Sequence, residues 1–184
     1  SVTYVRLPDG QTLPTAEAFT AARALSDTLL NGADPVYEAY VLDRDLQLPE
    51  ETYQGVRQYM QEHAVPSDPE GIAAYLRSCA RYDLRTPRAP GDQDFVLWFL
   101  RESDTGYCVH FASAAAVMLR ASGYPARYVT GFVADCRAGQ TVTVTDDTAH
   151  AWAEYYQDGD WIPLDATPGE AVRTSPEETV QPSE

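Results

Sequence analysis

The chain has 184 residues, 44% of them hydrophobic, which is enough for one ordinary domain with a core. Its net charge of -15 disfavours nucleic acids and anionic membranes as partners, because both attract basic surfaces. The longest apolar run, Phe95 to Leu100, is far shorter than the roughly 18 residues that span a bilayer, so we expect no membrane insertion by this segment.

The first part of the chain has the pattern of successive helices. Apolar residues recur at helical spacing over 19–29, before Asn31-Gly32, and again over 53–60. Ser67-Asp68-Pro69-Glu70 then predicts the start of a third helix, with a proline in its first turn. This half of the molecule is therefore predicted to be helical.

Toward the C-terminus the pattern changes from helices to strands. Asp94 is placed to cap a short apolar helix over 95–100. A helix of small residues is predicted from about Cys108 to Ala121, with Gly123 at its end. From there on the hydrophobic period is two, which indicates strands. The predicted strands span 127–134, 141–145, 148–156 and 161–165.

Helices followed by strands predict an α+β fold, in which N-terminal helices pack against a C-terminal antiparallel sheet. We divide the chain into an N-terminal helical extension (1–70), a core (71–170) and a tail (171–184). The tail is too polar to pack and is predicted to be flexible.

The chain has three cysteines, Cys79, Cys108 and Cys136. A disulfide framework would need a larger and even number. The three cysteines fit one reactive thiol and two structural ones. Cys108 is the candidate nucleophile, because a thiol reacts as the thiolate and the unpaired N–H groups at a helix N-terminus favour an anion. Gly106 is expected to allow a sharp entry into that helix.

Each of the three histidines is a candidate for the base that activates the thiol. His63 lies late in a predicted helix, without a partner signal. His110 is two residues from Cys108, and residues two apart on a helix do not face each other. His150 lies in a predicted strand, between two alanines that leave room around it. For any one of them, an ordinary structural role is the alternative.

A predicted hairpin singles out His150. Asp158-Gly159 is a strong signal for a two-residue turn. With that turn, His150 and Asp165 become diagonal neighbours on one face of the sheet, roughly 7–8 Å apart, within reach of a hydrogen bond between their side chains. A register slip of one residue would put them on opposite faces. Cysteine, histidine and aspartate then have the order of a catalytic triad.

Four sequence blocks resemble the core of the bacterial transglutaminase-like family over about 75–168. This resemblance implies a papain-like α+β core and marks Cys108, His150 and Asp165 as the catalytic triad. The blocks are Gly106–Ser113, Arg120–Phe132, His150–Glu154 and Asp165–Pro168.

The resemblance also implies roles for residues around the triad. Trp152 and Tyr107 are expected to contact substrate, with core packing as the alternative for Trp152. Arg127 and Glu154 are expected to be structural. An oxyanion hole would use the backbone N–H of Cys108 and a second donor, which the sequence leaves open.

Proteins of this kind crosslink glutamine to lysine, hydrolyse amides or peptides, or have lost the triad. We therefore predict thiol-dependent acyl transfer on protein or peptide carboxamides, without a cofactor or metal. The alternatives are a cysteine peptidase or amidase on the same triad, and a non-catalytic cell-surface interaction module. A zinc site of Cys108, His110 and His150 is disfavoured, because its spacing matches no usual motif.

The resemblance further implies an extracytoplasmic or cell-surface location within a larger membrane-anchored chain. All 13 basic residues of this chain are arginines. An enzyme that joins glutamine to lysine would therefore find no lysine in this segment of itself.

Overall fold

The computed structural model describes residues 4–6, 12–14, 35–134, 139 and 141–169. Near the N-terminus, β1 (Tyr4–Arg6) and β2 (Thr12–Pro14) form an antiparallel pair. The helices are α2 (Pro35–Asp45), α3 (Glu50–Glu62), α4 (Pro69–Cys79), α5 (Phe95–Glu102) and α6 (Cys108–Ala121), with a 3-10 turn η1 (Asp146–Thr148). The other strands are β3 (Arg81–Tyr82), β4 (Thr105–Gly106), β5 (Ala126–Phe132), β6 (Ala149–Gln157) and β7 (Asp160–Leu164).

The predicted α+β class is confirmed, and two aspartates start helices where the sequence indicated. Asp68 accepts the N–H of Gly71 at the start of α4, over 2.9 Å. Asp94 accepts the N–H groups of Val96 and Leu97 at the start of α5. Each carboxylate satisfies backbone donors that have no partner within the helix, which fixes where the helix begins.

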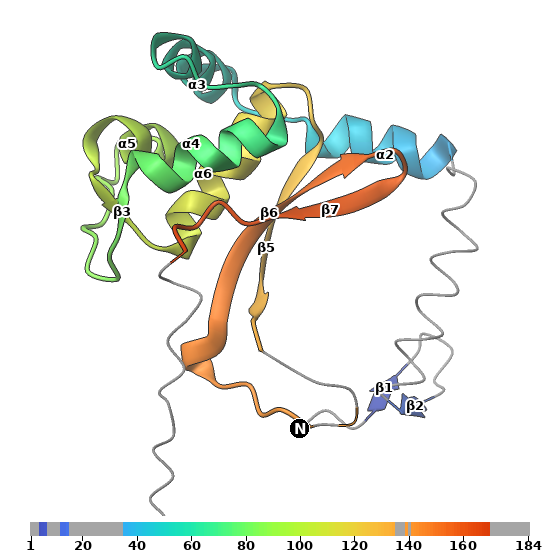
Figure 1. Ribbon diagram of the computed structural model, residues 1–184. Coiled ribbons are helices and arrows are strands. Elements are labelled where there is room, and N and C mark those ends of the chain that lie inside the picture. Colours follow the sequence, from blue (N-terminus) through green and yellow to red (C-terminus); the bar gives the residue numbers. More distant parts are fainter. Residues whose placement is uncertain (1–3, 7–11, 15–34, 135–138, 140, 170–184) are drawn as a thin grey trace, which may run out of the picture.

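Helix α6 is the centre of the core. Phe111, Met118 and Leu119 on this helix are completely buried. Helices α3, α4 and α5 pack on one side of α6, and the sheet β5-β6-β7 packs on the other (Figure 1). The alanines at 112 and 114–116 are buried, and their small size lets the sheet approach the helix closely.

The main sheet is antiparallel, with the strand order β5-β6-β7. Gln157 pairs with Asp160 around the Asp158-Gly159 turn, which confirms the predicted hairpin register. The two turn residues have φ of 54° and 92°, the left-handed conformation that this turn type requires. The register that the site prediction depends on is therefore present.

One predicted strand is wrong. Residues 141–145 are exposed and lie outside any strand; they lead into η1, and β6 begins only at Ala149. Alternation of Val142 and Val144 with threonines predicted a strand here, but a strand also needs a hydrogen-bonded partner.

Three further predictions fall on residues that the structure does not describe. These are the helix over 19–29, the tail 171–184 and the structural role of Cys136. The division of the chain at residue 70 stays a prediction.

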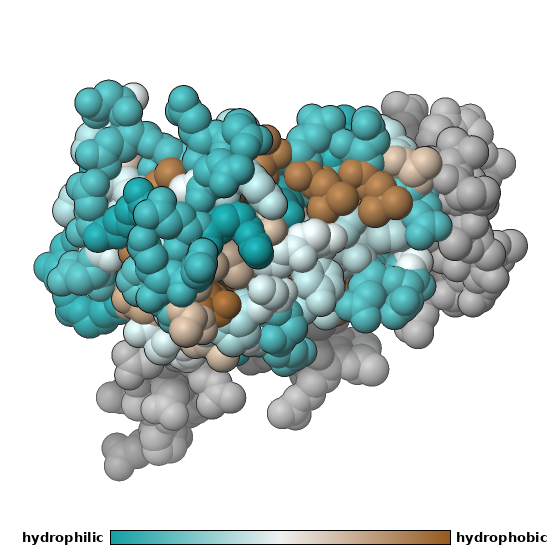
Figure 2. Space-filling model, turned by 90° about the horizontal axis from the view of Figure 1, so that it is seen from above, coloured by the Kyte–Doolittle hydropathy of each residue, from teal (hydrophilic) through white to brown (hydrophobic). Residues whose placement is uncertain are grey.

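One face of the molecule is largely polar. Figure 2 shows a face that is mostly hydrophilic, with a few small hydrophobic patches, in keeping with the acidic composition. In the part of the chain that the structure describes, no helix has the length and apolar character to cross a membrane.

Candidate active site

Cys108 is the first residue of α6, as predicted. A short parallel pair, β3 with β4, holds the chain just before it, and the N–H of Asp83 donates to the carbonyl of Gly106 over 2.8 Å. A β-carbon at Gly106 would lie 2.7 Å from the ring of Phe99. Glycine is needed here for space against the core, rather than for the sharp turn that the sequence suggested.

His110 is part of the structure that starts α6. Its Nδ1 accepts the backbone N–H of Tyr107 over 3.3 Å, and the residue is 2% exposed. Phe95, Trp98 and Phe99 surround the ring. Burial lowers the pKa of His110, so this histidine is neutral at physiological pH.

His150 and Asp165 form a hydrogen-bonded pair. Nε2 of His150 lies 2.8 Å from Oδ2 of Asp165, and the imidazole side chain is 10% exposed. The other carboxylate oxygen, Oδ1, accepts the N–H of Thr167 over 2.9 Å. Since both oxygens are engaged, the carboxylate holds one orientation and leaves Nδ1 of His150 as the nitrogen available to a nucleophile.

A cleft of about 340 Å³ has both Cys108 and His150 in its lining. It lies between the start of α6 and the strands β5 and β6, and its lining is mostly apolar. The other lining residues are Val109, Tyr128, Thr130, Gly131, Phe132, Ala149 and Ala151. The structure therefore brings the predicted nucleophile and base to one solvent-accessible hollow.

Two tyrosines near the thiol were not identified from the sequence. Burial raises the pKa of Tyr82 and of Tyr128, and the negative charge of a Cys108 thiolate raises both further. Both phenols therefore keep their protons at neutral pH, and Tyr128 is among the residues that line the cleft.

Arg77 is a further residue of the site that the sequence did not reveal. This residue of α4 donates a hydrogen bond from its guanidinium to the backbone carbonyl of Asp165. The contact joins positions 88 residues apart and so has no local sequence signal. It ties the backbone of Asp165 to the helical layer.

The predicted substrate contacts lie at the edges of the site. The ring of Tyr107 packs on His110. Trp152 stacks beside His150 at 6.3 Å, and a β-carbon at Gly131 would lie 2.8 Å from its ring. Neither aromatic residue is among those that line the cleft, so their contact with substrate stays a prediction.

The pair of Arg127 and Glu154 has contacts of a structural kind. Two guanidinium nitrogens of Arg127 donate to Oε2 of Glu154, over 2.7 and 2.5 Å. The guanidinium also stacks over Trp161 at 4.1 Å. These contacts link the three strands of the sheet.

The remaining cysteine within the described residues is of a different kind from Cys108. Cys79 is half-buried, and its thiol donates to the carbonyl of Leu76 over 3.3 Å. Burial raises the pKa of Cys79 to about 11. Within the described residues, no group of three or more histidine, cysteine or acidic side chains is arranged to hold a metal ion.

The chain is similar to proteins of known family. Residues 52–166 match the model of the transglutaminase-like superfamily. It is 35% identical over 141 residues to the uncharacterized protein YebA of Bacillus subtilis, covering 69% of this chain and 19% of that protein. It is 36% identical over 135 residues to a protein-glutamine gamma-glutamyltransferase of Pseudomonas aeruginosa, covering 67% of this chain and 20% of that protein.

A solved structure has the same fold. The periplasmic domain of TgpA from Pseudomonas aeruginosa, bound to ethylmercury, superposes with a TM-score of 0.57 at 32% identity. The match covers 74% of this chain and 52% of that one. These matches confirm the predicted papain-like α+β core. The chain spans about a fifth of the length of the two curated relatives.

Proposed function

The chain belongs to the transglutaminase-like superfamily, and on this basis we propose that it carries out thiol-dependent acyl transfer on protein or peptide carboxamides. Cys108 is the nucleophile, His150 is its base, and Asp165 orients the histidine. The observation that carries the proposal is the 2.8 Å hydrogen bond between His150 and Asp165, at a cleft that also contains Cys108.

The first half of the reaction forms a thioester. Nδ1 of His150 takes the proton of the thiol, and Asp165 stabilises the resulting imidazolium through Nε2. The Cys108 sulfur attacks the carboxamide carbon, the C–N bond breaks, and ammonia leaves with the proton that His150 returns. The backbone N–H of Cys108, at the first position of α6, has no acceptor within the helix, and in this proposal it donates to the oxyanion.

The second half releases the acyl group. A primary amine attacks the thioester carbon, His150 takes the amine proton, and the sulfur leaves as the thiolate. The product is a secondary amide. Water in place of the amine yields a carboxylic acid, so exclusion of water from the cleft decides between transfer and hydrolysis. The apolar lining of the cleft favours transfer.

The experiment offers the domain a glutamine-containing protein and a fluorescent primary amine, and follows ammonia and bound label by mass spectrometry. Wild type is expected to incorporate label, and Cys108→Ala is expected to incorporate none. Cys79→Ala is the matched control, because it also removes a thiol but from a half-buried position outside the cleft. Equal labelling by wild type and Cys108→Ala would refute the proposal.

Two other outcomes identify the alternatives. Ammonia or new peptide termini without bound label would indicate an amidase or peptidase that uses the same triad. No product, together with a Cys108 thiol that iodoacetamide does not alkylate, would indicate a non-catalytic interaction module.

The location is part of the same proposal. The matching solved domain of the Pseudomonas protein is described as periplasmic, and the curated relatives are about five times longer than the matched segment. We therefore place this domain outside the cytoplasmic membrane, within a larger membrane-anchored chain. Protease treatment of intact cells tests this location, because a cytoplasmic domain would be protected.

A further inference from the structure

Strand β5 forms one edge of the main sheet, and its backbone groups alternate between two directions. The N–H of Val133 donates to Thr148, and the N–H of Tyr156 donates to the carbonyl of Pro125. In an antiparallel ladder, the backbone N–H and C=O groups of every second residue bond to the neighbouring strand, and the backbone groups of the residues between them point to the other side of the strand. In the register of β5 with β6, the backbone groups of the odd-numbered residues of β5 therefore bond to β6, and those of the even-numbered residues point outward from the sheet edge.

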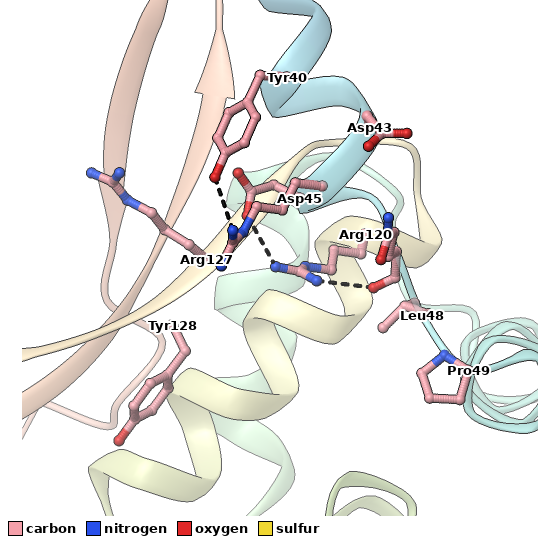
Figure 3. Close-up of a pocket in the computed structure, with 10 residues that line it drawn as sticks. Tyr40, Asp43, Asp45, Leu48, Pro49, Arg120, Arg127 and Tyr128 are labelled. Carbon is pink, nitrogen blue, oxygen red and sulfur yellow. Dashed lines mark hydrogen bonds and ion pairs between the residues drawn. The ribbon is translucent and has the colours of Figure 1, made fainter. Parts of the chain in front are cut away.

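Three residues consequently present outward backbone groups, namely Tyr128, Thr130 and Phe132. The outward carbonyl of Ala126, one step earlier, is occupied, because Nε of Arg120 donates to it over 2.7 Å. Arg120 also donates to the carbonyl of Gln47 and to Asp45 (Figure 3). Among the described residues, the part of this edge that has no strand partner thus begins at Tyr128 and runs to Phe132, a length of about 13 Å at the usual rise of a strand.

This edge lacks the features that usually prevent an edge strand from pairing. Charged residues, prolines and bulges commonly serve that purpose. From residue 128 to residue 132, β5 contains none of the charged residues and no proline. The opposite edge strand, β7, carries Asp160 and Pro163. The contrast indicates that pairing is blocked on one edge and permitted on the other.

The exposed edge borders two hollows. Tyr128, Thr130 and Phe132 line the cleft that contains Cys108. Tyr128 also lines a larger hollow of about 920 Å³, which lies between the end of α2, the loop after it and the start of β5 (Figure 3). In Figure 3 the ring of Tyr128 hangs from β5 at the border of that hollow. The two hollows therefore meet at Tyr128, where the exposed edge begins.

We infer that this edge binds the carboxamide substrate as an extended, unstructured polypeptide segment, which adds to the sheet beside β5 and delivers a glutamine side chain to Cys108. The inference rests on the proposed function. Backbone pairing with Tyr128, Thr130 and Phe132 supplies affinity without regard to sequence, and the larger hollow takes side chains that flank the glutamine. A glutamine within a folded helix cannot pair in this way, because its backbone groups are already bonded.

The experiment measures binding to Cys108→Ala, so that its result does not depend on turnover. The probe is an unstructured glutamine peptide of about ten residues, made in two forms that carry N-methyl groups on alternate residues, out of phase with each other. Only every second backbone N–H of the peptide can pair with β5, and N-methylation removes those N–H groups in one of the two forms. That form is expected to bind at least about tenfold more weakly than the other. Equal affinity of the two forms would overturn the inference.

Amide hydrogen exchange gives a second, direct readout. The N–H groups of Tyr128, Thr130 and Phe132 are expected to exchange more slowly once the unmethylated peptide is bound. Protection confined to other residues would overturn the inference. A peptide that binds in the expected phase, but is not turned over by wild type, would overturn the proposed chemistry and leave the binding edge standing.

Discussion

The carboxylate of Asp165 accepts two hydrogen bonds whose donors are fixed by their surroundings. Oδ1 accepts the backbone N–H of Thr167, a residue only 4% exposed, and Oδ2 contacts Nε2 of His150. In Asp165→Asn, the amide oxygen is expected to stay with the Thr167 N–H, because the reverse orientation would bring two donors together. The amide NH₂ then donates to Nε2.

This change places the imidazole proton on the wrong nitrogen. With Nε2 as an acceptor, neutral His150 carries its proton on Nδ1 and cannot take the proton of the Cys108 thiol. Loss of the charge-assisted hydrogen bond alone is worth about 1.5–3 kcal/mol, or roughly 10- to 150-fold in rate. Together with the wrong tautomer, we expect acyl transfer to slow by roughly a thousandfold to ten-thousandfold.

The assay is steady-state ammonia release from a glutamine peptide, with folding checked by urea denaturation. Asp165→Ala is the comparison variant, because it removes both oxygens without imposing a tautomer. We expect Asp165→Asn to be at least as slow as Asp165→Ala. The reasoning would be refuted by an asparagine variant within about threefold of wild type, or by an alanine variant that is much the slower of the two.

Four further predictions concern this site and the core behind it. Iodoacetamide at pH 8 is expected to label Cys108 well before Cys79, as followed by peptide mapping. Burial raises the pKa of Cys79 from 9.0 to about 11, so the neutral thiol contributes stability below pH 9 that is lost as the pH rises toward 11. Urea titrations should show this loss of stability in wild type and not in Cys79→Ala. Arg77→Met removes the hydrogen bond to the backbone carbonyl of Asp165 and should lower kcat by about fivefold at nearly unchanged Tm. A lower Tm with normal kcat would contradict a positioning role for Arg77. Gly106→Ala forces a β-carbon against a core ring and should cost about 1–3 kcal/mol of unfolding free energy, whereas Gly91→Ala, in open space, should change it by under about 0.5 kcal/mol.

Local sequence signals predicted the elements that depend on neighbouring residues. The caps at Asp68 and Asp94, the helix from Cys108 and the Asp158-Gly159 hairpin all arise from contacts within a few residues, so composition and spacing are sufficient. Because that hairpin fixes the register, it also allowed the pairing of His150 with Asp165 to be predicted. Where a pattern needed a distant partner, as in residues 141–145, the prediction failed.

The sequence by itself determined which residues face each other across one hairpin, because side chains on adjacent strands alternate with a fixed period of two. Only the tertiary structure decided that Cys108 shares a cleft with His150, that Arg77 anchors Asp165, and that β5 is an edge strand of the sheet that the described residues form. These features join segments that are tens of residues apart along the chain. Their positions follow from how helices and sheet pack around α6, and no local pattern of residues encodes that packing.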